Sequence, residues 1–228
     1  MSLFTNSNYT CGQCGHLYAM EVVGSVNAAR RPDLRAAILD ETFQDSACPQ
    51  CANTVRMEPS FTYVDAGRGQ WIASMPARDM ADYRSGERRA AELFSKSYGA
   101  LAPAAAQTVG AGLLPRLTYG WPAVREKVLI NELGLDDATV ELMKLDLLRR
   151  MPEAPLRPGV ELRLVSMEEE RMRFEWVGAA DEAVINGLSI GRELYDVIAA
   201  DTDGWAALRS VLVDGYFVDM QKTYMSEG

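Results

Sequence analysis

All four cysteines of the chain lie in two Cys-x-x-Cys pairs, Cys11/Cys14 and Cys48/Cys51. Pairs at this spacing can bring four thiolates into the tetrahedral arrangement that Zn²⁺ favours in structural sites. A shell of four sulfurs leaves no coordination position for water or substrate, so we expect a structural ion and not a catalytic one. Loss of one ligand is then expected to unfold part of residues 8–75 and not to abolish a reaction.

Two other interpretations of the cysteines stay open, a pair of redox dithiols and a reduced site that binds no metal. A thioredoxin-like redox motif normally occurs once, where a helix begins after a strand, whereas here two pairs flank a strand-rich segment. Sites made only of thiolates at this spacing strongly prefer zinc. The pattern therefore favours zinc over both alternatives.

The length and composition bound the class of protein. A chain of 228 residues fits one large domain or two small ones, and its 48% apolar residues can form a sizeable core. No stretch reaches the roughly 18 apolar residues of a membrane helix. The first residues lack the basic and apolar segments of a secretory signal. Together with the unpaired-looking cysteines, these features predict a soluble cytoplasmic protein that does not bind membranes.

The formal charge of −9 disfavours nucleic acid as a partner. Four zinc-bound thiolates would add −4 + 2 = −2 and bring the charge to about −11, because metal ligands lose their protons. General nucleic-acid binding depends on Lys and Arg that neutralise phosphates. The basic residues here occur as short doublets, which are typical of solvated helix ends and not of a continuous basic stripe: Arg30-Arg31, Arg88-Arg89 and Arg149-Arg150.

Patterns of apolar residues, turns and caps predict an α+β fold. We expect an N-terminal zinc-ribbon-like β module with a helical insertion, followed by a mixed helix and β-hairpin region. In the module, strands are expected at 16–23, 43–47, 55–57, 61–64 and 71–75, with a helix that begins at Pro32. In the remainder, we expect helices at 78–97, from 122, up to 150, at 189–200 and at 205–212, a short strand at 117–119, and a hairpin around 168–170.

These elements suggest three regions: residues 1–76 as the zinc-ribbon-like module, 77–115 as a helix and a flexible apolar linker, and 116–228 as an α+β region. The segment 100–114 is small and apolar and carries Pro103, Gly110 and Gly112. We interpret it as a linker or a partner-binding loop.

Three further sequence pieces accompany the cysteines. Ser25-Val26-Asn27 and Pro32-Asp33-Leu34-Arg35 lie between the pairs, Phe61-Thr62-Tyr63-Val64-Asp65 and Trp71-Ile72 follow them, and Arg125-Glu126-Lys127-Val128-Leu129-Ile130 precedes Leu135-Asp136-Asp137. With these pieces, residues 8–150 resemble the CpXC domain family, named for paired Cys-Pro-x-Cys motifs. Gly12 stands where the first motif usually has Pro, and Ala52 where Gly commonly follows the second. The resemblance implies a bacterial protein with a structural zinc site and supplies no catalytic residues.

Other candidate chemistry is weaker. His16 is the only histidine, and we expect it to pack beside the first cysteine pair and not to act as a general base. Paired acids can act in glycosidases or bind Mg²⁺, but here they fall at expected helix starts and hairpin tips, where they stabilise structure or stay solvated. These acids are Asp136/Asp137, Glu168 to Glu170, and Asp181/Glu182.

The sequence thus favours a non-catalytic protein-interaction or scaffold protein with an unidentified protein partner. The alternative is a zinc-ribbon regulator that binds nucleic acid, in which Arg30, Arg31, Arg56 and Arg68 would form a local basic face. An enzyme is the third hypothesis, and it would need a deep cleft with converging carboxylates. The oligomeric state is not predicted.

Overall fold

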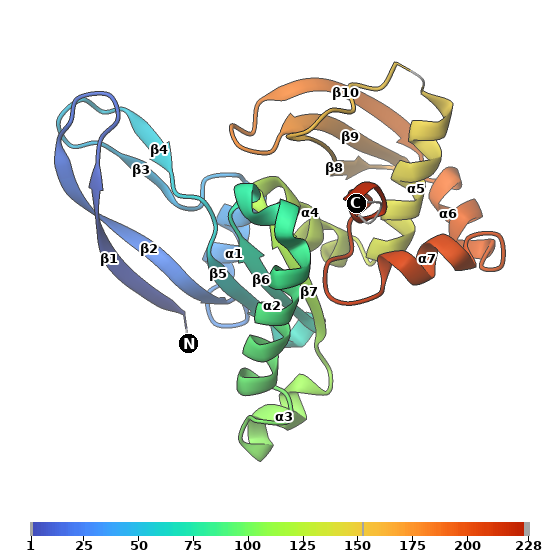
Figure 1. Cartoon of the computed structure of the whole chain (residues 1–228), viewed down its shortest axis with the longest axis horizontal. Coiled ribbons are helices and arrows are strands. Elements are labelled where there is room, and N and C mark those ends of the chain that lie inside the picture. Colours follow the sequence, from blue (N-terminus) through green and yellow to red (C-terminus); the bar gives the residue numbers. More distant parts are fainter. Residues whose placement is uncertain (1, 152, 226–228) are drawn as a thin grey trace.

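The computed structural model describes residues 2–151 and 153–225, and ten strands within these ranges build three β layers (Figure 1). In this part of the chain the strands form a five-stranded sheet, a three-stranded sheet and a two-stranded ribbon. The N-terminal sheet and the ribbon carry the cysteines at their turns, and helices cover both larger sheets. The predicted α+β class, with a hairpin region after the cysteine-bearing module, is confirmed.

The five-stranded sheet has the order β1-β2-β5-β6-β7. Its strands are β1 (Leu3–Thr10), β2 (Leu17–Asn27), β5 (Phe61–Asp65), β6 (Gln70–Met75) and β7 (Leu114–Tyr119). β1 pairs with β2 and β5 with β6 in antiparallel fashion, whereas β2–β5 and β6–β7 are parallel. Only the end of β2, from Ser25 to Asn27, pairs with β5. The rest of the β1–β2 hairpin therefore projects from the body (Figure 1).

The projecting part is completed by the ribbon of β3 (Asp45–Ala47) and β4 (Thr54–Arg56), which pair antiparallel. We call β1, the free part of β2, this ribbon and the turns between them the arm. The turn between β1 and β2 carries the first cysteine pair, and the turn between β3 and β4 carries the second. Both pairs thus lie at the far end of the arm (Figure 1).

Helices pack on the two faces of the five-stranded sheet. α1 (Pro32–Leu39) and α4 (Gly120–Glu132) share one core with β2, β5 and β6, in which Trp121 of α4 meets Phe43 and Phe61. α2 (Tyr83–Ser97) packs with Trp71 and Leu117 in a second core. Pro32 at the start of α1 confirms that expected boundary, since proline suits the first helical position.

The three-stranded sheet has the order β10-β9-β8 and is antiparallel throughout. Its strands are β8 (Val160–Glu168), β9 (Arg171–Gly178) and β10 (Val184–Gly191). It shares the largest core with the helices α5 (Asp137–Arg150), α6 (Glu193–Ala200) and α7 (Ala206–Leu212). α4 contacts β6, β7 and β8, so this helix lies between the two sheets.

Four local predictions differ from the structure. The segment 100–114 contains the helix α3 (Ala104–Gly110), so it is not only a linker or loop. The helix expected from residue 78 begins at Tyr83, after a 3₁₀ segment (Ala77–Asp82). Residues 189–191 belong to β10 and not to a helix, because they pair with β9. β1 (Leu3–Thr10) was not among the expected strands, the first of which was placed at 16–23. Two further short segments are 3₁₀ Ala66–Arg68 and the helix α8 (Lys222–Met225).

The division at residues 76 and 115 stays a prediction. The five-stranded sheet continues across both positions, because β7 pairs with β6 from Gln70↔Leu114 to Met75↔Tyr119.

Among the described residues, no helix combines the length and the apolar character that a bilayer crossing requires.

A row of alternating charges, buried except for the half-buried Arg116, runs from β7 through α5 and α4 to β8. It begins with Arg116–Asp137 at 2.6 Å and continues in order with Asp137–Lys127 at 3.1 Å, Lys127–Glu141 at 3.2 Å, Glu141–Lys144 at 3.1 Å, Lys144–Glu126 at 2.7 Å and Glu126–Arg163 at 2.9 Å. Arg163 ends the row by pairing with both Glu161 and Asp219. We call these nine residues the charge row. Each member contacts an opposite charge, as buried ions require.

The pKa values of the charge row reflect the balance between burial and partners. Burial alone would raise the pKa of Glu126, but Lys144 and Arg163 outweigh it and lower that pKa. For Glu141 the effect of burial is larger than that of Lys144 and Lys127, so its pKa is raised. The row holds five carboxyls (Glu126, Asp137, Glu141, Glu161, Asp219) and four basic groups (Arg116, Lys127, Lys144, Arg163), an excess of 5 − 4 = 1 carboxyl. A raised pKa at Glu141 is consistent with that excess.

Removing one cation from the middle of the charge row should be costly. Lys144 is fully buried between Glu126 and Glu141, and Lys144→Met would keep its volume while leaving both acids short of a partner. We expect a loss of about 3–5 kcal/mol in the free energy of unfolding, measured by urea denaturation. Lys96→Met is the matched control, because Lys96 and Glu92 are both exposed, and its cost should stay below about 0.5 kcal/mol. Equal costs for the two variants would contradict a structural role for the row.

Candidate metal centre

The two cysteine pairs adopt the same turn. In each turn, the amide of the first cysteine donates to the carbonyl five residues later, and that cysteine's carbonyl accepts from the amide four residues later. The bonds are Cys11 to His16 and Gly15 to Cys11 in the first turn, and Cys48 to Asn53 and Ala52 to Cys48 in the second, all at 2.9 Å. Both turns therefore place their two sulfurs on one side, as expected for a pair of zinc knuckles.

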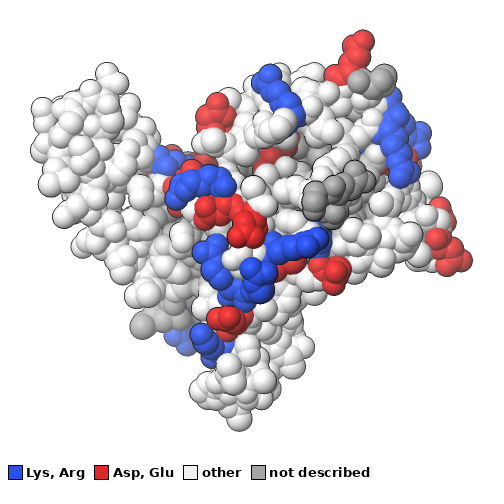
Figure 2. Space-filling model, in the orientation of Figure 1, with Lys and Arg blue, Asp and Glu red and all other residues white. Residues whose placement is uncertain are grey.

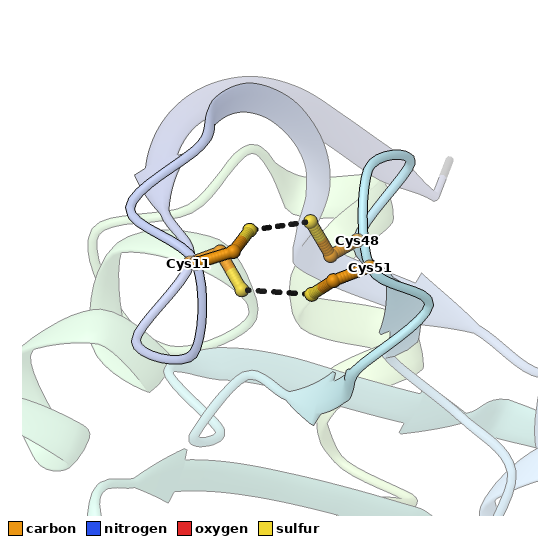
Figure 3. A group of neighbouring side chains, drawn as sticks. Cys11, Cys48 and Cys51 are labelled. Atoms are coloured by element: carbon orange, nitrogen blue, oxygen red, sulfur yellow. Dashed lines mark hydrogen bonds between the residues drawn. The ribbon is translucent and has the colours of Figure 1, made fainter.

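The four sulfurs converge between the turns (Figure 3). Cys11 Sγ lies 3.7 Å from Cys51 Sγ, and Cys14 Sγ lies 3.7 Å from Cys48 Sγ. All four atoms lie within 4.8 Å of one another. Four sulfurs bound tetrahedrally at 2.3 Å from Zn²⁺ would be about 3.8 Å apart, whereas a disulfide would need about 2.05 Å. The predicted ligands Cys11, Cys14, Cys48 and Cys51 are thus brought together as free thiols with room for one metal ion.

Gly15 and Ala52 occupy equivalent positions in the two turns, and both positions require a left-handed backbone. Both follow the second cysteine of their turn, and both have positive φ, 73° at Gly15 and 57° at Ala52. A left-handed backbone is natural for glycine and costs other L-residues free energy. The departure from glycine at Ala52 therefore preserves the turn at a local conformational cost.

The backbone and the crowding of sulfurs set the acidity of the thiols. The amides of Cys14 and Gln13 point at the Cys11 sulfur and lower the pKa of its thiol to about 7. The His16 amide acts in the same direction on Cys14, but desolvation and the neighbouring thiols outweigh it and raise the Cys14 pKa to about 12. The Asn53 amide is likewise outweighed at Cys51, whose pKa is raised. Four thiolates at this distance need a cation to offset their repulsion.

His16 lies beside the cluster and not in it. Its carbonyl accepts the Cys11 amide, and its ring stacks on Tyr18 at a centroid distance of 6.3 Å. The sulfurs of the first cysteines, Cys11 and Cys48, are on buried residues, whereas Cys14 and Cys51 are exposed. This placement agrees with the expected packing role of His16.

Three side chains hold the ribbon and the residues that flank it against β2 and against α4. Gln44 bridges the ribbon to β2, since its Oε1 accepts the Val23 amide at 2.9 Å and its Nε2 donates to the Glu21 carbonyl at 3.3 Å. Trp121 Nε1 donates to the Met57 carbonyl at 2.7 Å, and the Arg56 guanidinium lies over the Trp121 ring. The ribbon is therefore fixed to α4 by contacts that do not involve the cysteines.

Comparison with known proteins supports the same assignment. The model of the CpXC protein family matches residues 9–144, which is more than half of the 228 residues. The chain belongs to the CpXC protein family. No curated protein and no solved structure gives a match. The CpXC match covers both cysteine turns, the helices α1 to α4 and most of α5, whereas β8 and everything after it lie outside the match.

The acidic candidates are distributed through the CpXC structure and are not collected at one site. Asp136 caps α5 by accepting the Thr139 amide at 2.7 Å, as predicted for a helix start. Asp137 is buried and binds Arg116 with both oxygens. Glu182 pairs with Arg56 on the ribbon. The acids Glu168 to Glu170 lie at the turn between β8 and β9, and Asp181 lies in the turn before β10.

The charge row was not predicted. The sequence predicted a hairpin around 168–170 but not that the Arg163 side chain of its first strand is buried between three acids. One signal was present: Glu141 and Lys144 are three residues apart, on a helix whose buried residues include Val140, Met143 and Leu147. A charged pair within an apolar helix face indicates a buried ion pair.

Substitutions at the two equivalent turn positions should act in opposite directions. Gly15→Ala places a Cβ in open space but in a left-handed backbone, so we expect zinc binding to weaken by about 1 kcal/mol, roughly fivefold. Ala52→Gly should strengthen zinc binding by up to about the same amount, because it removes the corresponding cost. Competition with a chelating dye measures both. Gly12→Ala is the control, since its Cβ meets nothing within 4 Å and its φ is not positive; a loss there equal to that of Gly15→Ala would contradict the argument.

Metal affinity should rise with pH. A metal binds the thiolate, so protons compete with it wherever a free thiol is below its pKa. With a pKa of about 12, Cys14 must release a proton at every pH from about 6 to about 9 and adds tenfold to the affinity for each pH unit. Cys11, with a pKa of about 7, adds to this slope only below about pH 7. Dye competition at a series of pH values should give a steeper slope below pH 7 than above it, and a pH-independent affinity would contradict the prediction.

Proposed function

We propose that this CpXC protein is a non-catalytic protein-interaction or scaffold protein whose arm is held together by a structural Zn²⁺ bound to Cys11, Cys14, Cys48 and Cys51. The observation that carries the proposal is the spacing of the four sulfurs. Two sulfur–sulfur distances between the two turns are 3.7 Å, which fits a closed tetrahedral shell. Such a shell has no open position for a substrate. Thiolates favour zinc over Ca²⁺ or Mg²⁺, which take oxygen ligands.

The arm supports an interaction role by its position and its surface. It extends away from both larger cores, so a partner could approach it from several sides (Figure 1). On the face in Figure 2 its outer part shows no charged side chains, in contrast to the body. Residues 1–20 contain no Asp, Glu, Lys or Arg. Free thiols favour a reducing compartment. For this reason, and because the CpXC family implies a bacterial protein, we propose that the protein lies in the bacterial cytosol.

A role in nucleic-acid binding is less well supported. Arg31, Arg56 and Arg68 are each paired with an acid, Asp33, Glu182 and Asp65 respectively. An ion pair with a neighbouring acid reduces the charge available to a phosphate. The remaining candidate, Arg30, lies in the turn before α1. These pairings and the charge of −9 favour a protein partner.

An enzymatic role also has less support. The carboxylates that converge do so in the charge row, where Glu126 and Glu141 are fully buried and paired with Lys144. A groove of about 740 Å³ lies against the arm and α2, and it is lined by three arginines and by two acids, Asp79 and Glu58, of which Glu58 pairs with Arg78. Catalysis by paired acids needs carboxylates that reach a substrate.

Metal analysis combined with a ligand substitution tests the proposal. We expect one Zn²⁺ per purified chain. Cys14→Ser should weaken zinc binding by more than tenfold and expose the backbone amides of the arm to hydrogen exchange, whereas α4 and α5 should stay protected because their cores do not include the arm tip. Gln13→Ala is the control within the same turn and should keep the metal.

The same variants test the interaction role. Partners that co-purify with the native protein should be lost with Cys14→Ser and retained with Gln13→Ala. If the purified protein contains no metal and the backbone amides of its arm are nevertheless protected from hydrogen exchange, the zinc assignment is contradicted. Turnover of a substrate that requires the cysteines would contradict the non-catalytic role.

A further inference from the structure

β1 is an edge strand that lacks the usual protection of edges. It forms one end of the five-stranded sheet, and in the described part of the chain only β2 pairs with it. Natural edge strands are normally blunted by charged residues, proline or bulges, because unpaired backbone groups recruit another strand. β1 carries neither a charge nor a proline, and its register is regular from Phe4 to Thr10. Leu17, opposite Thr10 on β2, is 61% exposed.

The outward backbone groups of β1 can be assigned from their neighbours. Glu21 and Val23 of β2 direct their carbonyl and amide to Gln44, on the side away from β1. Their opposite residues, Asn6 and Phe4, therefore do not bond to β2, since hydrogen-bonded and non-bonded pairs alternate in an antiparallel ladder. The Cys11 amide, which donates to His16, continues the same alternation. The free edge thus presents the amides and carbonyls of alternate residues: Phe4, Asn6, Asn8 and Thr10.

We propose that β1 pairs antiparallel with β1 of a second copy of this chain, so that two five-stranded sheets become one continuous sheet. The inference rests on the interaction role proposed above and names the partner of the arm. The best overlap places Ser7 opposite Ser7 on a two-fold axis. Asn6 then faces Asn8, and Phe4 faces Thr10, so that every outward amide and carbonyl from Phe4 to Thr10 obtains a partner.

Charge does not oppose a second copy at the β1 edge, although it does so elsewhere on the surface. Two chains of charge −9 repel each other, and an acidic surface is a poor place for them to meet. The β1 edge is uncharged, and the proposed register places no like charges opposite one another. An isologous contact needs only this one strand, which is complementary to itself.

The other strand edges are less suited to such pairing. β7, at the opposite end of the same sheet, is partly covered, because the Leu117 amide donates to the Tyr216 carbonyl. β10 is also uncharged, but it has a register shift between Val184 and Asn186 and a glycine at 187. Bulges and glycines twist an edge and weaken its pairing. The inference therefore concerns β1 and not β10.

The oligomeric state of the zinc-loaded protein tests the inference. Sedimentation equilibrium should show a reversible dimer. Asn8→Pro removes one outward amide without removing a bond to β2 and should raise the dimer dissociation constant at least tenfold. Asn8→Ala keeps that amide and is the matched control, expected to dimerise like the native chain. Zinc content and thermal unfolding establish that each variant is folded.

Charge substitutions at the proposed axis give a second test that does not depend on proline. Ser7→Glu and Ser7→Lys should each weaken self-association at least tenfold, because like charges would face each other. An equimolar mixture of the two variants should restore the dimer, since opposite charges would then meet. Restoration in the mixture supports the two-fold axis at Ser7.

Two outcomes would overturn the inference. One is a zinc-loaded monomer at concentrations up to about 1 mM, a limit beyond which association is negligible. The other is a dimer that Asn8→Pro, Ser7→Glu and Ser7→Lys all leave unchanged. A monomer that captures an extended segment of another protein through β1, with capture lost in Asn8→Pro and kept in Asn8→Ala, would overturn the second copy as partner while leaving the interaction role intact. Loss of zinc binding with an intact dimer would instead contradict the proposed metal function alone.

Discussion

The charge row connects the two halves of the body, and each of its charges depends on its neighbours in the row for a partner. Arg116 lies on β7 of one sheet, Arg163 lies on β8 of the other, and the residues between them come from α4 and α5. A buried ion pair stabilises little compared with apolar packing, but an unpaired buried ion is severely destabilising. The row therefore penalises any arrangement that shifts one helix against the other. We infer that the row thereby helps to select one relative placement of the two sheets.

The C-terminal segment is bound to both halves of the body by hydrogen bonds and ion pairs with charged side chains. Asp219 ends the row at Arg163, and the Met220 amide donates to Glu141 at 3.0 Å. Close by, the Phe217 amide donates to Glu87 at 2.9 Å, and Phe217 itself packs against Tyr83 and Tyr119. Glu87, a charged residue on α2, thus accepts a hydrogen bond from the backbone of the C-terminal segment. Three members of the charge row, Glu161, Arg163 and Asp219, lie beyond residue 144, where the family match ends, so the residues after the match extend a row whose six members within it already balance.

The sequence predicted the metal ligands and failed on the charge row for a single physical reason. The cysteine motif is local, because each pair shapes its own turn and only one long-range step joins the two turns. The burial of Arg163 or Lys144 is decided by partners on other elements, and no periodicity in one strand or helix reveals it. β10 was missed for a related reason, since the pairing of Leu188 with Phe174 overrides a helical pattern that continues into α6. Helix caps, which depend on near neighbours, were easier to predict, as Asp136 at the start of α5 illustrates.

The arm and the body are consequently stabilised in different ways. The body has large apolar cores and paired buried charges, which do not depend on any ligand. In the arm, both strands of the projecting hairpin are largely exposed, and the buried residues include Met20 and the cysteines Cys11 and Cys48. Burial on that scale is small beside the entropy of ordering the hairpin and the turns, and the proposed zinc site would add the free energy of metal binding. If the proposed zinc orders the arm, it would also govern whether the uncharged β1 edge is formed. The proposed metal site and the proposed pairing of β1 would then be linked through the order of the arm.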